Sequence, residues 1–173
     1  MKKIAVLLAA VLCAAPVFAG DAGIIKLSLW DRVAVAAPNN IDHITGVNIG
    51  IGANTEHVDG VQWNLVWSEA DLVHGINSAY IVAKSNEVVG IQNAIVSINE
   101  KSVTGLEDGL VNLANGEVIG AQIGFFNKVG DLHGAQIGIV NYAENISKGL
   151  QVGLVNIAKN GWFPVMIIVN GRF

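Results

Sequence analysis

The chain has 173 residues, of which 52% are hydrophobic and 14% are charged, with 10 Lys and Arg against 14 Asp and Glu. This balance excludes a disordered chain, and the lack of any cluster of basic residues argues against nucleic-acid binding. The 20 glycines exceed the average frequency of about 7% and indicate an unusual backbone.

The first 19 residues have the pattern of a secretory signal. Lys2 and Lys3 precede an apolar stretch that is too short to span a bilayer as a helix, and small residues follow at the usual cleavage positions. We therefore predict cleavage after Ala19 and export to the periplasm, the outer membrane or the cell surface. Loss of the two lysines leaves 8 basic against 14 acidic residues, a formal charge of −6.

The sole cysteine, Cys13, lies inside the predicted signal. An exported chain would carry no thiol, which excludes disulfides, thiolate metal sites and cysteine nucleophiles. Residues 20–45, which contain Trp30 and a Pro-Asn-Asn loop, lack the regularity of the rest and are predicted to form an N-terminal cap.

Residues 46–158 contain a repeat marked by glycines that are 14 or 15 residues apart. Self-similarity at a fixed period indicates a repeat architecture. The glycines, which we number as position zero of each repeat, are Gly46, Gly60, Gly75, Gly90, Gly105, Gly120, Gly134 and Gly149.

Apolar residues recur at positions one, three and five, an alternation that predicts a β-strand with these positions facing the interior. Position six is apolar as well, and this change of phase predicts a corner followed by a second short strand. A further apolar column lies two residues before each glycine: Ile44, Val58, Val73, Val88, Val103, Val118 and Leu132, with Ser147 as the exception.

Position two is an amide or its acid relative in every repeat. Stacked amides can hydrogen-bond along the axis of a repeat array, and we interpret this column as a structural ladder. Its glutamines are Gln62, Gln92, Gln122, Gln136 and Gln151. A second amide column is predicted at position seven: Asn112, Asn127, Asn141 and Asn156.

These patterns predict an all-β protein, a β-solenoid of about eight coils stacked at about 4.8 Å. Residues 20–45 and 159–173 would cap its open edges. The alternative is a small outer-membrane β-barrel, which secretion, strand length and the terminal Phe173 would fit. The scarcity of aromatic residues and the identical polarity of every repeat favour the solenoid.

Position three is apolar at both ends of the array but polar in the middle, at Ser78, Asn93 and Asp108. Together with the adjacent Glu107, these residues form a candidate polar strip. If this face points inward, the strip is a buried polar cluster that must satisfy its own hydrogen bonds. If it points outward, the strip is a solvated face or an acidic patch that holds a cation or a sugar hydroxyl. The histidines are scattered, with His74 and His133 four coils apart, so no metal site, cofactor or catalytic residue is predicted.

The phrases GAQIGFFNKVGD, GAQIGIVNYAEN and GLQVGLVNIAKN resemble the tandem GLQ-x-GLVN-x-A surface repeats of a group of exported bacterial proteins. The ending NGWFPVMIIVNGRF is also similar to the ends of such chains. The resemblance covers about residues 25–173 and is strongest from residue 105 onward. It implies an exported protein of the surface or periplasm and carries over no catalytic residue.

We therefore predict a structural or interaction repeat protein of the bacterial envelope, without catalytic activity. Its expected partner is an envelope or surface protein or a glycan, and membrane association stays open. Two alternatives remain: the outer-membrane β-barrel, and a carbohydrate-active or metal-assisted enzyme that would use Asn93, Glu107 and Asp108.

Overall fold

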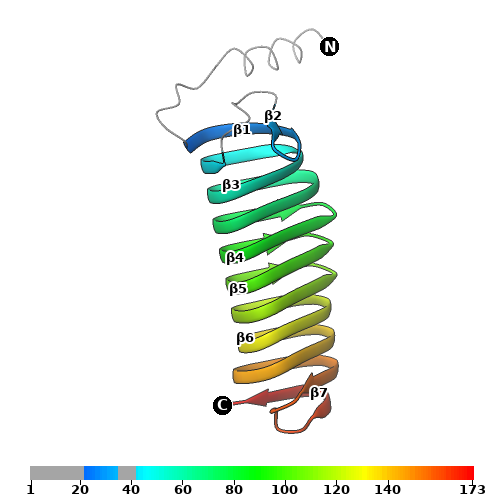
Figure 1. The fold of residues 1–173 in the computed structure, drawn as a ribbon. Helices are drawn as coiled ribbons and strands as arrows, with labels where there is room; N and C mark the ends of the chain where they lie inside the picture. The colour runs from blue at the N-terminus through cyan, green and yellow to red at the C-terminus, as the bar shows by residue number, and fades with distance from the viewer. Residues whose placement is uncertain (1–21, 35–41) are drawn as a thin grey trace.

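The computed structural model describes residues 22–34 and 42–173, and the chain in these ranges winds as β-structure around one long axis (Figure 1). The predicted signal, residues 1–19, lies outside the described residues. The strands are β1 (Ala22–Trp30), β2 (Val33–Ala34), β3 (His43–Ala79), β4 (Val82–Asn93), β5 (Val96–Asp108), β6 (Val111–Ala158) and β7 (Val165–Arg172). In the described part of the chain, no helix has the length and apolarity required to cross a membrane.

The strands β1, β3, β4, β5 and β6 pair in parallel, each with the next. Gly75 lies beside Gly90, Gly90 beside Gly105 and Gly105 beside Gly120, so each repeat lies on the one before it. The predicted β-solenoid is confirmed. The alternative of a barrel is wrong, because its neighbouring strands would run in opposite directions.

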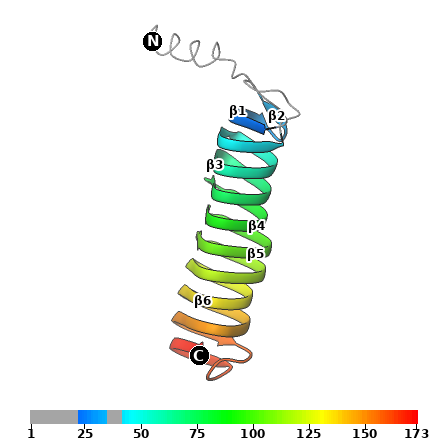
Figure 2. The ribbon, with the colours of Figure 1, turned by 90° about the vertical axis from the view of Figure 1, so that its left-hand side faces the viewer.

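The number of separate strands differs from the predicted count of about eight coils. The reason is that β3 and β6, with 37 and 48 residues, run through several repeats without a break. A view turned by 90° shows the same elongated stack, with β1 and β7 at opposite ends (Figure 2).

The repeat glycines allow successive coils to approach closely. Gly105 has a φ of +137°, which L-residues rarely adopt, and a Cβ on it would overlap the carbonyl oxygen of Gly90. The same overlap with the preceding glycine would occur at Gly60, Gly75, Gly90, Gly120, Gly134 and Gly149. The period of the sequence therefore reflects one close backbone contact per coil.

Corners divide the coils into two strands at the predicted place. The chain leaves β-structure at residues 80–81, 94–95 and 109–110, which are positions four to six of their repeats. The asparagine at position seven holds this corner: Asn112 Nδ2 donates to the carbonyl oxygen of Ile123 in the next coil, at 2.8 Å.

Burial reverses the predicted orientation of the strand that precedes the corner in each coil. Gln122 at position two is fully buried, whereas its neighbours Ile123 and Phe125 at positions three and five are 40% and 60% exposed. The prediction that positions one, three and five fill the interior is therefore wrong. The column two residues before each glycine does lie inside, as Val103 and Val118 show.

Strand alternation separates two faces without saying which one is internal. Amides can occupy the interior here because their donors are bonded: Gln122 Nε2 reaches Glu107 Oε2 at 2.6 Å and the carbonyl oxygen of Lys128 at 3.2 Å. Small residues such as Ala114 and Ala143 on the second strand complete the core.

Both ends of the stack are covered by strands that lie outside the glycine-marked repeats. At the C-terminal end, β7 pairs antiparallel with the last coil, from Gly149 opposite Arg172 to Ile157 opposite Val165. At the N-terminal end, β1 pairs with the short β2 on one side and with β3 on the other. These strands occupy edges that would otherwise be open to other chains.

Candidate functional site

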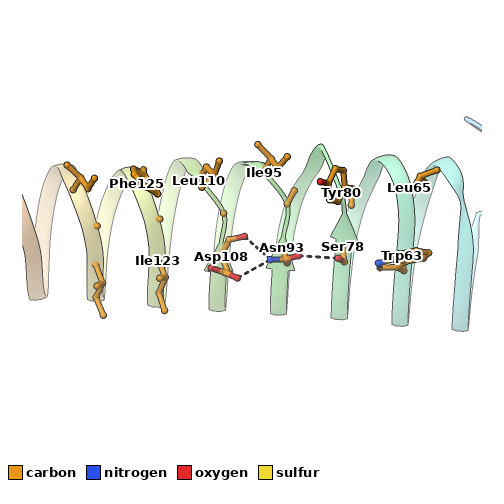
Figure 3. A pocket seen from close by; sticks show the side chains of 17 residues that line it. Trp63, Leu65, Ser78, Tyr80, Asn93, Ile95, Asp108, Leu110, Ile123 and Phe125 are labelled. Atoms are coloured by element: carbon orange, nitrogen blue, oxygen red, sulfur yellow. Dashed lines mark hydrogen bonds between the residues drawn. The ribbon is translucent and has the colours of Figure 1, made fainter.

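A groove of about 700 Å³ runs along the corner between the two strands of successive coils. Its floor consists of the small residues at position four: Ala79, Ala94, Gly109, Gly124 and Gly138. Figure 3 shows side chains of position five on one side of it and those of position three on the other. The position-five wall contains Leu65, Tyr80, Ile95, Leu110, Phe125 and Ile139.

The predicted polar strip lies in the position-three wall of this groove. Ser78 Oγ donates to Asn93 Oδ1 at 3.4 Å, and Asn93 Nδ2 donates to Asp108 Oδ2 at 3.0 Å and to the Asp108 carbonyl oxygen at 3.2 Å (Figure 3). Trp63 continues the wall beyond Ser78, and Ile123 continues it beyond Asp108. The three polar residues thus form one hydrogen-bonded chain within an otherwise apolar wall.

Glu107 does not belong to this strip, so its predicted grouping with Asp108 is wrong. Its side chain is fully buried in the position-two column, whereas Asp108 is exposed in the groove. Consecutive residues of a strand point to opposite faces, which explains the separation. An acid and a base on opposite sides of a strand cannot act on one bond, because catalysis needs both within reach.

Burial raises the pKa of the Glu107 carboxyl to about 7, although the hydrogen bond from Gln122 acts in the opposite direction. Oε1 of Glu107 has no hydrogen-bond partner. The protonated carboxyl is therefore favoured at pH values below about 7, since ionisation would leave a charge in the interior.

The predicted amide ladder is built in two parts with opposite directions. In the C-terminal part each amide donates toward the preceding coil: Gln151 to Gln136 at 2.7 Å, Gln136 to Gln122 at 2.7 Å, and Gln122 to Glu107. In the N-terminal part, Asn48 Nδ2 donates forward to Gln62 Oε1 at 2.8 Å.

Serines on the second strand link the N-terminal part of the ladder. Ser68 Oγ accepts from Gln62 Nε2 at 2.8 Å and donates to Asn77 Oδ1 at 2.5 Å, and Ser85 Oγ donates to Gln92 Oε1. The two directions meet between Gln92 and Glu107. Gln92 Nε2 donates to the carbonyl oxygens of Ala83 and Ile98, so it supplies no donor to Glu107, and Glu107 can donate only when it is protonated.

The predicted asparagine column forms a second, uniform ladder. Asn112, Asn127 and Asn141 each donate to the next asparagine, ending at Asn156, with every N–O distance 2.8 Å. All four side chains are buried. Both amide columns are therefore internal scaffold and form no part of the groove surface.

Sequence reasoning missed the groove and its apolar walls. The exposed members of the position-five column include Tyr80 at 69%, Phe125 at 60% and Leu154 at 66%. The signal was present, because a column of small residues at position four lies between two columns of large ones. Reading it as a groove required knowing that the large columns face outward.

A histidine cluster near the N-terminal end was also missed. Asp59 bonds two histidines from neighbouring coils, His43 Nε2 at 2.8 Å and His74 Nδ1 at 3.0 Å, and these bonds lower the pKa of the carboxyl. The ring of His57 lies 5.6 Å from that of His43. In the described residues no group of three metal-ligating side chains is arranged to hold an ion.

Fold and groove together define the described part of the chain as a capped β-solenoid with an apolar, exposed corner. Comparisons with protein-family models, with curated proteins and with solved structures gave no match.

Proposed function

We propose that this chain is an exported structural or interaction protein of the bacterial envelope, which works by contact through its corner groove and not by catalysis. The observation that carries this proposal is the continuous apolar wall at position five, exposed along the rod. Exposed apolar patches of this extent are uncommon on soluble monomers and mark interaction sites. The sequence pattern of a secretory signal and the resemblance to surface repeats support the envelope location.

Two features of the groove support contact over chemistry. Asp108 is the single charged residue among those that line it, and its bonded neighbours Asn93 and Ser78 are neither nucleophile–base partners nor a metal set. Glu107, the second acid of the enzyme alternative, lies inside the coil.

The part of each coil that follows the corner has a different character. Ion pairs join neighbouring coils there, including Lys84 with Glu69 and Lys101 with Glu87, both at 3.2 Å. Charged residues on the strand after the corner and in the following turn keep that part of the coil solvated. The rod is thus amphipathic across its section, and a partner would cover the groove side.

The test uses the protein in the envelope of the cells that make it. We expect it to be released with the envelope fraction as an assembly larger than one chain. Leu110→Asp combined with Phe125→Asp should reduce that assembly to single chains, because both side chains form the groove wall. Ile167→Asp is the matched control, since Ile167 is exposed on β7, outside the groove. A single-chain size for the unaltered protein would refute the proposal.

A further inference from the structure

We propose that the partner covering the groove is a second copy of this chain, packed antiparallel about a two-fold axis at Asn93. This inference rests on the proposed function, in which the groove is the contact surface, and names its occupant. It is carried by the order of residues along the position-three column.

The pattern of apolar and polar residues along this column is the same from either end. In β1, Leu27 lies beside Ile49 and so extends the column by one level. The column then contains three apolar, three polar and three apolar residues: Leu27, Ile49, Trp63, Ser78, Asn93, Asp108, Ile123, Ile137 and Val152. Asn93 is the middle member.

A two-fold axis through Asn93, perpendicular to the rod, would therefore place like on like. Ile49 of one copy would face Ile137 of the other, and Trp63 would face Ile123. An interface in which the same patch serves both copies is the commonest form of protein self-association. The position-five column matches as well, because it is apolar at every level, from Leu29 to Leu154.

The polar strip selects the antiparallel direction. In that arrangement the Asp108 carboxylate of one copy faces the Ser78 hydroxyl of the other, which would donate to it in place of its 3.4 Å bond to Asn93. Asn93 faces Asn93, so no two like charges come into contact. In a parallel arrangement the two Asp108 carboxylates would face each other, and like charges in contact are unfavourable. Buried polar groups of this kind fix the register of self-association.

The surface is large enough for a specific dimer. Nine levels at about 4.8 Å give a length of about 38 Å, and positions one to five of a strand span about 13 Å. The contact then covers about 500 Å² on each copy and about 1,000 Å² in all, which reaches the size of biological interfaces.

A lipid surface fits the groove less well than a second copy. Asp108 would enter the apolar phase without a partner of opposite charge, which is unfavourable. The chain also has more acidic than basic residues, 14 against 10, so anionic headgroups would repel it.

The test is a charge exchange across the proposed axis, measured by sedimentation equilibrium of the purified full chain. Ile49→Lys alone and Ile137→Asp alone should each weaken the dimer by about tenfold or more, because each places a charge against an apolar residue. Both changes in one chain should restore dimerisation to within about threefold, since the introduced lysine of one copy would then face the introduced aspartate of the other. The two sites are six levels apart, so no bond within one chain can explain the rescue.

Introduced cysteines give a second measurement that does not depend on charge. In a Cys13→Ser background, Asn93→Cys should form a disulfide-linked dimer by itself. Ile49→Cys and Ile137→Cys should each stay unlinked alone and form the linked dimer when the two variants are mixed. Both side chains are exposed, at 43% and 45%, so the folded solenoid should persist, which far-UV circular dichroism checks.

The inference is wrong if the purified chain is a monomer at about 100 μM. It is also wrong if Ile49→Cys forms a linked dimer by itself, or if the chain is a monomer that binds phosphatidylcholine vesicles. The proposed function fails separately. If the envelope assembly is lost on groove substitution while the purified chain is a monomer, the groove binds a different partner. The proposed function then stands and the second-copy inference falls.

Discussion

Gln122 Nε2 donates to Glu107 Oε2 over 2.6 Å inside the solenoid, and this bond ends the C-terminal part of the amide ladder at a carboxyl group. A glutamine at residue 107 would supply the donor that the carboxylate lacks. The ladder therefore ends at an ionisable group that is fully buried in the core.

We expect Glu107→Gln to stabilise the protein at pH 8 by about 3 kcal/mol, since a shift of one pKa unit corresponds to about 1.4 kcal/mol. The sign follows from linkage: the folded-state pKa of about 7 lies above the ordinary value of 4.5. The folded state therefore binds more protons between these values, and stability falls as pH rises from about 4.5 to about 7. Urea unfolding of both forms across this range measures the effect. An unchanged pH dependence in the variant would contradict it.

Gly105→Ala should destabilise the solenoid by about 2–4 kcal/mol, because the residue has a positive φ and a Cβ would overlap the backbone of Gly90. Thermal unfolding gives the difference. Thr104→Ala, at the exposed neighbouring residue, is the control and should change stability by less than about 0.5 kcal/mol. Equal losses of stability at both residues would show that the close contact between stacked glycines does not determine which residue fits at position zero.

Asn127→Ala should lower the free energy of unfolding by about 2 kcal/mol. The change removes hydrogen bonds to Asn112, to Asn141 and to the Ile137 carbonyl oxygen inside the core. Asn86→Ala is a matched change at a half-buried asparagine bonded to Asp71, and we expect a loss within about 0.5 kcal/mol. Chemical denaturation of the two variants separates fully buried from half-buried amides. A loss at Asn86 equal to that at Asn127 would argue against a structural ladder.

The carboxyl of Asp59 should titrate below its ordinary pKa of 3.8, because His43 and His74 both bond to it. Because the folded-state pKa is lowered, the ionised Asp59 stabilises the folded state above about pH 4. This stabilisation is lost as the pH falls further. In the double variant His43→Phe and His74→Phe, the midpoint measured by NMR should rise toward 3.8. A midpoint that stays in place would show that the histidines do not set it.

The sequence predicted most of the fold because each repeat presents the same residues at the same positions. Spacing of the glycines predicted the stacking, and the adjacent apolar residues at positions five and six predicted the corner. The orientation of the first strand could not be predicted in the same way. Its two faces, amide at Gln122 and apolar at Ile123, each form an uninterrupted column, so periodicity alone does not distinguish inside from outside.

The candidate site was only partly predictable for the same reason. Ser78, Asn93 and Asp108 were identified as exceptions within an apolar column, and the structure joins them by hydrogen bonds. Glu107 was misplaced, because adjacency in sequence was taken for adjacency in space. The bonds from Asp59 to His43 and His74 span 16 and 15 residues, and only the stacking of coils brings these side chains together.

The amino-acid sequence by itself determined the period, the strand class and the composition of every column, because these follow from local conformation repeated along the chain. Only the tertiary structure decided which columns face inward. The amides can satisfy one another inside a coil once the coils stack, as the bond from Gln136 to Gln122 shows, and this frees the large apolar side chains to form the walls of an exposed groove. That choice depends on contacts between coils, which no single repeat contains.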